Sequence, residues 1–215
     1  MIRSKPIVSP LGTFKFPALS EPDTSKFSIE KCGEGIYKTD VLFTEGDAGW
    51  DELQLKLRAV YDDGADATRK DPDKKKRKLY PQIHPWIKTE TDKEGEETGK
   101  MLITVKLPAT TRAGASCKPI LVDAARNNLS ADSTPIWGGT RGKVSFYASF
   151  YNMPIGSGVS LRLIGAQIIE LVSSSSNMSA DSAGFDVEEG YEAPVAAPVA
   201  ASVVEDEYED DTSPF

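Results

Sequence analysis

The chain is poor in the side chains on which most metal and catalytic sites depend. It has one histidine, His84, in 215 residues, so no two-histidine metal motif can form within it. Its two cysteines, Cys32 and Cys117, lie far apart and form no Cys-x-x-Cys pair. We therefore expect two reduced thiols, no metal and no cofactor.

Long apolar runs are also missing. No segment approaches the roughly 18 apolar residues of a membrane-spanning helix. The N-terminal sequence MIRSKPIVSP has no apolar region of the kind found in secretory signals. These features predict a protein of the cytoplasm with no membrane partner.

Motifs for phosphate binding or hydrolysis are not supported either. Residues 138–143, GGTRGK, lack the G-x-x-x-x-G-K spacing and lead toward a strand, so we interpret them as a glycine-rich turn. The densest acidic cluster of the body, Asp62, Asp63 and Asp66, is typical of a solvated helix end and not of carboxylates that converge on a metal. The residues favour a non-enzymatic protein, with a small DNA-processing nuclease as an alternative.

The charge of the chain is distributed very unevenly. It has 25 Lys and Arg against 33 Asp and Glu, for a net charge of −8. From Asp181 onward there are 11 acidic and no basic residues, so residues 1–180 hold 25 basic against 33 − 11 = 22 acidic residues, a net charge of +3. A mildly basic body with an acidic tail points to nucleic acid.

Composition divides the chain into three parts. We expect an ordered domain over residues 1–172, interrupted by a basic loop or hairpin insertion at 70–100. Residues 173–204 open with serines and continue with alanine, proline and valine, which predicts a flexible linker. Residues 205–215, EDEYEDDTSPF, form an acidic tip that ends in Pro-Phe.

The pattern of apolar residues predicts a mainly β domain. Strands are expected at 36–44, 101–108, 118–123, 143–151 and 159–172, the last with a bulge or bend at Gly165. Residues 47–69 fit either a strand or a helical face, and their length favours a helix capped by Asp47. Several short strands with one helix predict a small five-stranded barrel.

Residues 143–151, KVSFYASFY, carry the strongest candidate for a binding surface. In a strand, alternate apolar residues face the core, whereas Lys143, Tyr147 and Tyr151 face outward with serines between them. Single-stranded nucleic acid is bound by such surfaces, because rings stack on bases while cations follow the backbone.

Other cations and aromatic residues extend this candidate DNA-binding set. The insertion adds Lys74, Lys75, Lys76, Arg77, Lys78, Tyr80, Trp86 and Lys88, either as a solvated loop or as a mobile flap that clamps a strand. Residues elsewhere in the body add Lys38, Arg112, Arg126, Arg141 and Arg162.

Three blocks of the sequence resemble the single-stranded DNA-binding proteins of phages. They are FKFPALSEPDT with GEGIYKTDVLF, PILVDA with IWGGTRGKVSFYASF, and GVSLRLIGAQIIEL, followed by the acidic tail that ends in phenylalanine. The resemblance covers most of the chain but not the 70–100 insertion. It implies an OB-fold that binds single strands in a groove, similar in architecture to bacterial single-stranded DNA-binding protein.

The resemblance also implies a role for the tail, which in such proteins recruits replication proteins or occupies the groove in the absence of DNA. Here the candidate partner-binding residues are Glu205, Asp206, Glu207, Glu209, Asp210, Asp211, Pro214 and Phe215. We therefore expect a monomer or homodimer that coats single-stranded DNA during phage replication or recombination in the cytoplasm of an infected bacterium. Polymerase, primase or helicase is the expected tail partner, and an adaptor or structural protein without DNA binding is a second alternative.

Overall fold

The computed structural model describes residues 4–44, 46–73, 77–82, 85–111, 113–130 and 135–172. Lys74, Lys75, Lys76, His84 and Arg112 lie outside these ranges, as do the linker and the acidic tip. What the sequence predicts for them stays a prediction.

The described chain forms eight strands and two helices. The strands are β1 (Ile7–Val8), β2 (Gly12–Asp23), β3 (Ile36–Thr44), β4 (Lys88–Thr91), β5 (Glu97–Pro108), β6 (Ile120–Val122), β7 (Arg141–Met153) and β8 (Gly156–Glu170). The helices are α1 (Lys26–Cys32) and α2 (Trp50–Arg69). Each segment predicted as a strand contains one, and the helix favoured for residues 47–69 is present.

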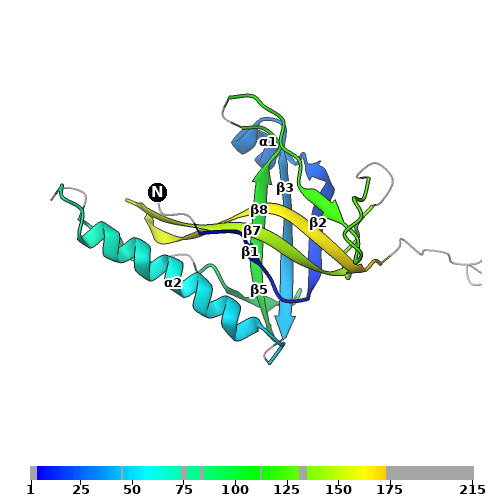
Figure 1. The fold of residues 1–215 in the computed structure, drawn as a ribbon, viewed down its shortest axis with the longest axis horizontal. Coiled ribbons are helices and arrows are strands. Elements are labelled where there is room, and N and C mark those ends of the chain that lie inside the picture. Colours follow the sequence, from blue (N-terminus) through cyan, green and yellow to red (C-terminus); the bar gives the residue numbers. More distant parts are fainter. Residues whose placement is uncertain are drawn as a thin grey trace, which may run out of the picture. The chain divides into compact units, whose positions relative to one another are not determined.

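The strand pairings close into a ring. Strands follow one another in the order β7-β2-β3-β5-β8, and β8 pairs back to β7. Within the ring every pairing is antiparallel except the short parallel contact of β5 with β8. Figure 1 shows β3 and β5 crossing the long β7–β8 ribbon. This arrangement agrees with the predicted mainly β fold class. Residues 88–100 of the insertion belong to the β4–β5 hairpin.

Alternation along the strands places the core inside the ring. On β7, Val144, Phe146 and Ala148 are fully buried, while the residues between them are half-buried on the outer face. The two faces predicted for residues 143–151 are therefore confirmed. Burial of each large aliphatic or aromatic side chain contributes about 1.5–3 kcal/mol, so the inner face dominates the stability of the ring.

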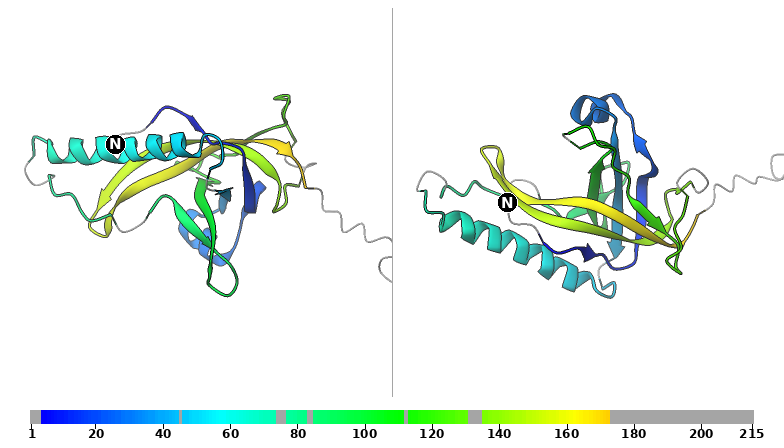
Figure 2. Two further views of the ribbon diagram at one scale, coloured as in Figure 1. Left: turned by 90° about the horizontal axis from the view of Figure 1, so that it is seen from below. Right: turned by 45° about the horizontal axis from the view of Figure 1, so that its top comes forward.

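Helix α2 lies along the curved β7–β8 ribbon (Figure 2). Its buried side chains recur at helical spacing, beginning with Trp50, Leu53, Leu57 and Tyr61. The Trp50 ring stacks on Phe43 of β3 with 4.8 Å between ring centroids. Of the two described helices, neither has the length and apolar character needed to cross a membrane.

Two local predictions about helices were wrong. Asp47 does not cap α2, because the helix begins at Trp50 with Gly49 in the N-cap position, and the Asp47 carboxylate instead accepts a hydrogen bond of 2.6 Å from the Thr44 amide. The sequence predicted one helix, but α1 is a second. Its apolar residues Phe27 and Ile29 are exposed. The helix therefore lacks the apolar face that would have indicated it in the sequence.

The irregularity predicted at Gly165 is present. The register of β7 against β8 shifts between Ser145, which pairs with Gly165, and Phe146, which pairs with Leu163. A Cβ atom on Gly165 would lie 2.3 Å from the Ile120 carbonyl oxygen. The glycine therefore allows β6 to approach β8 closely.

Candidate nucleic-acid interface

A row of long polar side chains crosses the outer face of the ring. Strand register places Lys38 of β3 opposite Lys106 of β5, Lys106 opposite Arg162 of β8, and Arg162 opposite Tyr147 of β7. Residues paired in this way lie on one face of a sheet, with about 4.8 Å between neighbouring strands. We call these four residues the cross-strand row.

Part of the row borders a groove of about 720 Å³. Lys88, Lys106 and Arg162 give the groove a positive charge, and none of its described lining residues is acidic. The rings of Trp86 and Tyr151 form part of its wall. The groove thus combines cations with aromatic surface.

Both rings are held by contacts beneath them. Tyr151 pairs with Gly158, where a Cβ atom would lie 2.6 Å from the tyrosine oxygen, so the ring can lie across β8 only because residue 158 is glycine. The Trp86 ring packs on Tyr61 of α2 at a centroid distance of 5.1 Å. The Tyr61 hydroxyl is in turn hydrogen-bonded to the Ser157 hydroxyl over 3.0 Å.

The insertion is fastened to the β7–β8 hairpin just before the groove. The Tyr80 amide donates to the Asn152 side-chain oxygen over 3.0 Å, and the Asn152 amide group donates to the Lys78 carbonyl over 2.8 Å. The Ser157 hydroxyl donates to the Tyr80 carbonyl over 2.8 Å, and its backbone amide donates to the Pro81 carbonyl over 2.9 Å. Residues 78–81 of the insertion are therefore tied to the β7–β8 hairpin.

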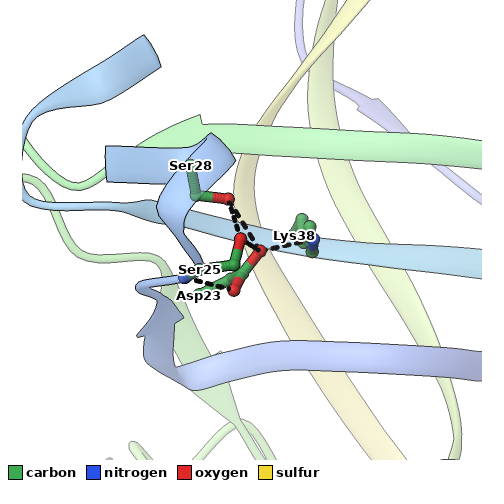
Figure 3. Close-up of polar contacts among 4 residues, drawn as sticks. All are labelled: Asp23, Ser25, Ser28 and Lys38. Atoms are coloured by element: carbon green, nitrogen blue, oxygen red, sulfur yellow. Dashed lines mark hydrogen bonds and ion pairs between the residues drawn. The ribbon is translucent and has the colours of Figure 1, made fainter. Parts of the chain in front are cut away.

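Lys38 of the row has a strong acidic partner. Its Nζ lies 2.6 Å from a carboxylate oxygen of Asp23 at the end of β2 (Figure 3). The same carboxylate accepts hydrogen bonds from the Ser28 hydroxyl over 2.7 Å and from the Ser25 amide over 2.9 Å. The Lys38 ammonium, followed by the Ser28 hydroxyl, holds the pKa of Asp23 well below its ordinary value.

Comparisons with known proteins bear on the fold that carries this surface. No family model matches the chain, and no curated protein matches its sequence. Among solved structures, gp2.5, a single-stranded DNA-binding protein encoded by bacteriophage T7, superposes with a TM-score of 0.64 at 20% identity, over 88% of this chain and 98% of that one. The fold is that of a phage single-stranded DNA-binding protein.

A second structure agrees with the first. The single-stranded DNA-binding protein from bacteriophage Enc34, in complex with single-stranded DNA, superposes with a TM-score of 0.52 at 17% identity. The match covers 78% of this chain and 88% of that one. The OB-like fold class and the resemblance to phage single-stranded DNA-binding proteins are thereby confirmed.

Within this fold, several candidate residues lie away from the row and its groove. Arg141 forms a 2.9 Å ion pair with Glu170, and the exposed Arg77 donates to the Asp71 carbonyl over 2.6 Å. Lys143 lines a second groove, with Arg126 and apolar residues. Lys143, Tyr147 and Tyr151 thus share one strand face but not one groove.

Lys106 is the residue of the row that the sequence analysis missed. It lies in the strand MLITVKLP, where the buried Val105 and Leu107 flank it and alternation directs it outward. The alternation of this strand therefore predicts an outward lysine. Without aromatic residues beside it on the same face, however, a single lysine does not indicate a binding surface. The parallel pairing of β5 with β8, which brings it beside Arg162, is a tertiary feature.

Side chains suited to other chemistry are dispersed. Cys32 and Cys117 are both free thiols. Across the part of the chain that the structure describes, no three His, Cys, Asp or Glu side chains are grouped to hold a metal ion. The glycine-rich residues 138 and 139 form a turn before β7, as interpreted from the sequence.

Proposed function

We propose that the chain binds single-stranded DNA across the cross-strand row and in the groove beside it. The observation that carries this proposal is the register that brings Lys38, Lys106 and Arg162 together from three different strands, with Tyr147 next in line. Cations about one strand spacing apart, roughly 4.8 Å, can follow a phosphate backbone. The Enc34 protein, which has a related fold, binds single-stranded DNA in its solved structure, which supports the proposal.

The aromatic rings explain a preference for single strands. Trp86 and Tyr151 on the groove wall, with Tyr147 in the row, present faces on which an unpaired base can stack. Each stacked base contributes roughly 1–3 kcal/mol and requires no particular sequence. A duplex keeps the faces of its bases covered, so it gains only the backbone contacts. The protein would hold strands unpaired and shield them without catalysing a reaction.

We also propose that residues 205–215 compete with DNA and recruit partners. Tethered through the linker, their carboxylates would reach an effective concentration on the order of millimolar at the cationic groove. DNA would displace them and leave Pro214 and Phe215 available to a polymerase, primase or helicase. This role fits a protein of phage replication or recombination in the cytoplasm of an infected bacterium.

A binding experiment with two chain lengths tests both the DNA binding and the competition by the tail. Labelled oligo-dT and a matched duplex are titrated with the full chain and with a chain ending at residue 204. We expect preference for oligo-dT, tighter binding by the shortened chain at low salt, and wild-type DNA affinity in the control Phe215→Ala, which keeps every tail carboxylate. Unchanged affinity after shortening would contradict tail competition. Cleavage that depends on a divalent metal would favour the nuclease, and no binding by either chain would favour the adaptor.

A further inference from the structure

Strand β2 carries a β-bulge that turns an aromatic ring outward next to the row. Lys15 pairs with Asp40 and Ala18 pairs with Lys38, so Phe16 and Pro17 together face the single residue Thr39. Two residues opposite one define a bulge, which re-aims a side chain. Phe16 is 71% exposed, whereas Phe14, two positions earlier, is 1% exposed.

The backbone of Phe16 is in a conformation that a bulky residue rarely adopts. Its φ is 50°, in the left-handed region, where bulges of this kind usually have glycine. A phenylalanine there is unfavourable, and little burial offsets the cost because most of the ring faces solvent. Strain of this type is concentrated at functional sites.

The bulge extends the cross-strand row by one strand. Ala18 lies directly opposite Lys38, and Phe16 is two residues before Ala18 on the same strand, so β2 adds an aromatic ring beside the Lys38 end of the row. The Lys15 ammonium lies 5.5 Å from the centroid of the Phe16 ring and is also paired with the Glu90 carboxylate over 2.6 Å.

From the strained backbone, the exposed ring and its place at the end of the row, we propose that Phe16 is a base-stacking residue of the DNA-binding surface. This inference rests on the proposed function and adds a contact on β2 to it. A strand crossing the row would place phosphates near the three lysine and arginine side chains and one base against the Phe16 ring. The ring would contribute through base faces and not through phosphate charge.

The strain allows a test in which a stacking role and a structural role give opposite results. Phe16→Asn removes the ring and supplies a residue that tolerates left-handed φ. We expect the melting temperature to stay equal or rise, and the Kd for oligo-dT to weaken roughly 5- to 150-fold, the range for loss of one stacked base. Phe16→Trp keeps an aromatic ring and should retain near wild-type affinity.

A strand without bases separates stacking from charge. An abasic oligomer with the same number of phosphates should bind Phe16→Asn and wild type equally, and the salt dependence of oligo-dT binding should not change. Leu55→Asn is the matched control, because Leu55 on α2 is 70% exposed but lies off the row. It should bind both strands as wild type does.

The outcomes distinguish this inference from the proposed function. If wild type fails to bind oligo-dT, the proposed function itself is contradicted. If wild type binds and Phe16→Asn binds equally well, only the inference about Phe16 is overturned. If Phe16→Asn lowers the melting temperature and weakens binding of the abasic strand as much as binding of oligo-dT, Phe16 has a structural role and the inference is again overturned.

Discussion

The Lys38 ammonium lies 2.6 Å from the Asp23 carboxylate while its backbone pairs with Lys106, so one cation of the cross-strand row is held by an anion of the protein itself. A phosphate that approaches Lys38 must share this ammonium group with the carboxylate or displace it. Asp23 therefore restrains the affinity of the surface in our account.

The variant Asp23→Asn tests this restraint. We expect oligo-dT binding to tighten a few-fold at low salt, and the slope of log K against log salt to become steeper by at most about 0.7, because Lys38 no longer shares its charge between the phosphate and the Asp23 carboxylate. In a Lys38→Met background the same substitution should have no effect on binding. Glu52→Gln is the matched control, since it frees Lys56 on α2, away from the row. Weaker binding by Asp23→Asn would show that the carboxylate holds Lys38 in its DNA-binding position, contrary to our account.

The close contact of Tyr151 with Gly158 allows the stacking of a base on the Tyr151 ring to be tested. In Gly158→Ala the new Cβ atom would lie 2.6 Å from the tyrosine oxygen, so the ring must leave its place across β8. Because the displaced group is the end of a side chain, we expect little change in melting temperature but weaker binding of oligo-dT. The effect should disappear in a Tyr151→Leu background. An equal loss of affinity in both backgrounds would rule out an action through the ring.

The ion pair of Glu90 with Lys15 should make the stability of the fold depend on pH. The Lys15 ammonium at 2.6 Å, followed by the Thr98 hydroxyl, holds the pKa of Glu90 below its ordinary value of 4.5. A depressed pKa contributes stability above the unfolded-state pKa, and this stability is lost as pH falls through the lower folded-state value. We expect the free energy of unfolding, measured with urea from pH 7 to pH 3, to decline below about pH 4.5. The free energy of unfolding of Glu90→Gln should decline less steeply over this range. A pH profile parallel to that of wild type would contradict the stabilising role of the Glu90 carboxylate.

Much of the fold follows from periodicity that can be read in the sequence. The clean alternation of 143–151 gave the inner and outer faces of β7 because each side chain is directed by its position alone. The bulge of β2 could not be read in this way, because it depends on the pairing of Phe16 and Pro17 with one residue of β3. Helix α1 escaped prediction because its apolar residues Phe27 and Ile29 are exposed.

The candidate site was predictable residue by residue but not as an arrangement. Lys38, Tyr147 and Arg162 were identified as separate candidates, and only strand register shows that they form one row with Lys106. Lys143 and Tyr151 share the predicted outer face of β7 but line different grooves, which the sequence could not indicate. Ion pairs such as that of Arg141 with Glu170 are likewise set by contacts between strands distant in sequence.

The most direct test of the account is the salt dependence of oligo-dT binding by wild type and by a Lys106→Met/Arg162→Met double variant, followed through intrinsic tryptophan and tyrosine fluorescence. Lys56→Met/Arg58→Met on α2 is the control for loss of two surface cations, as both residues are exposed and paired within the helix. We predict quenching in wild type, weaker binding by the double variant, and a slope reduced by about 1.4, or 0.7 for each lost phosphate contact. A slope and affinity equal to those of wild type in the double variant would contradict the assignment of the cross-strand row as the DNA-binding surface.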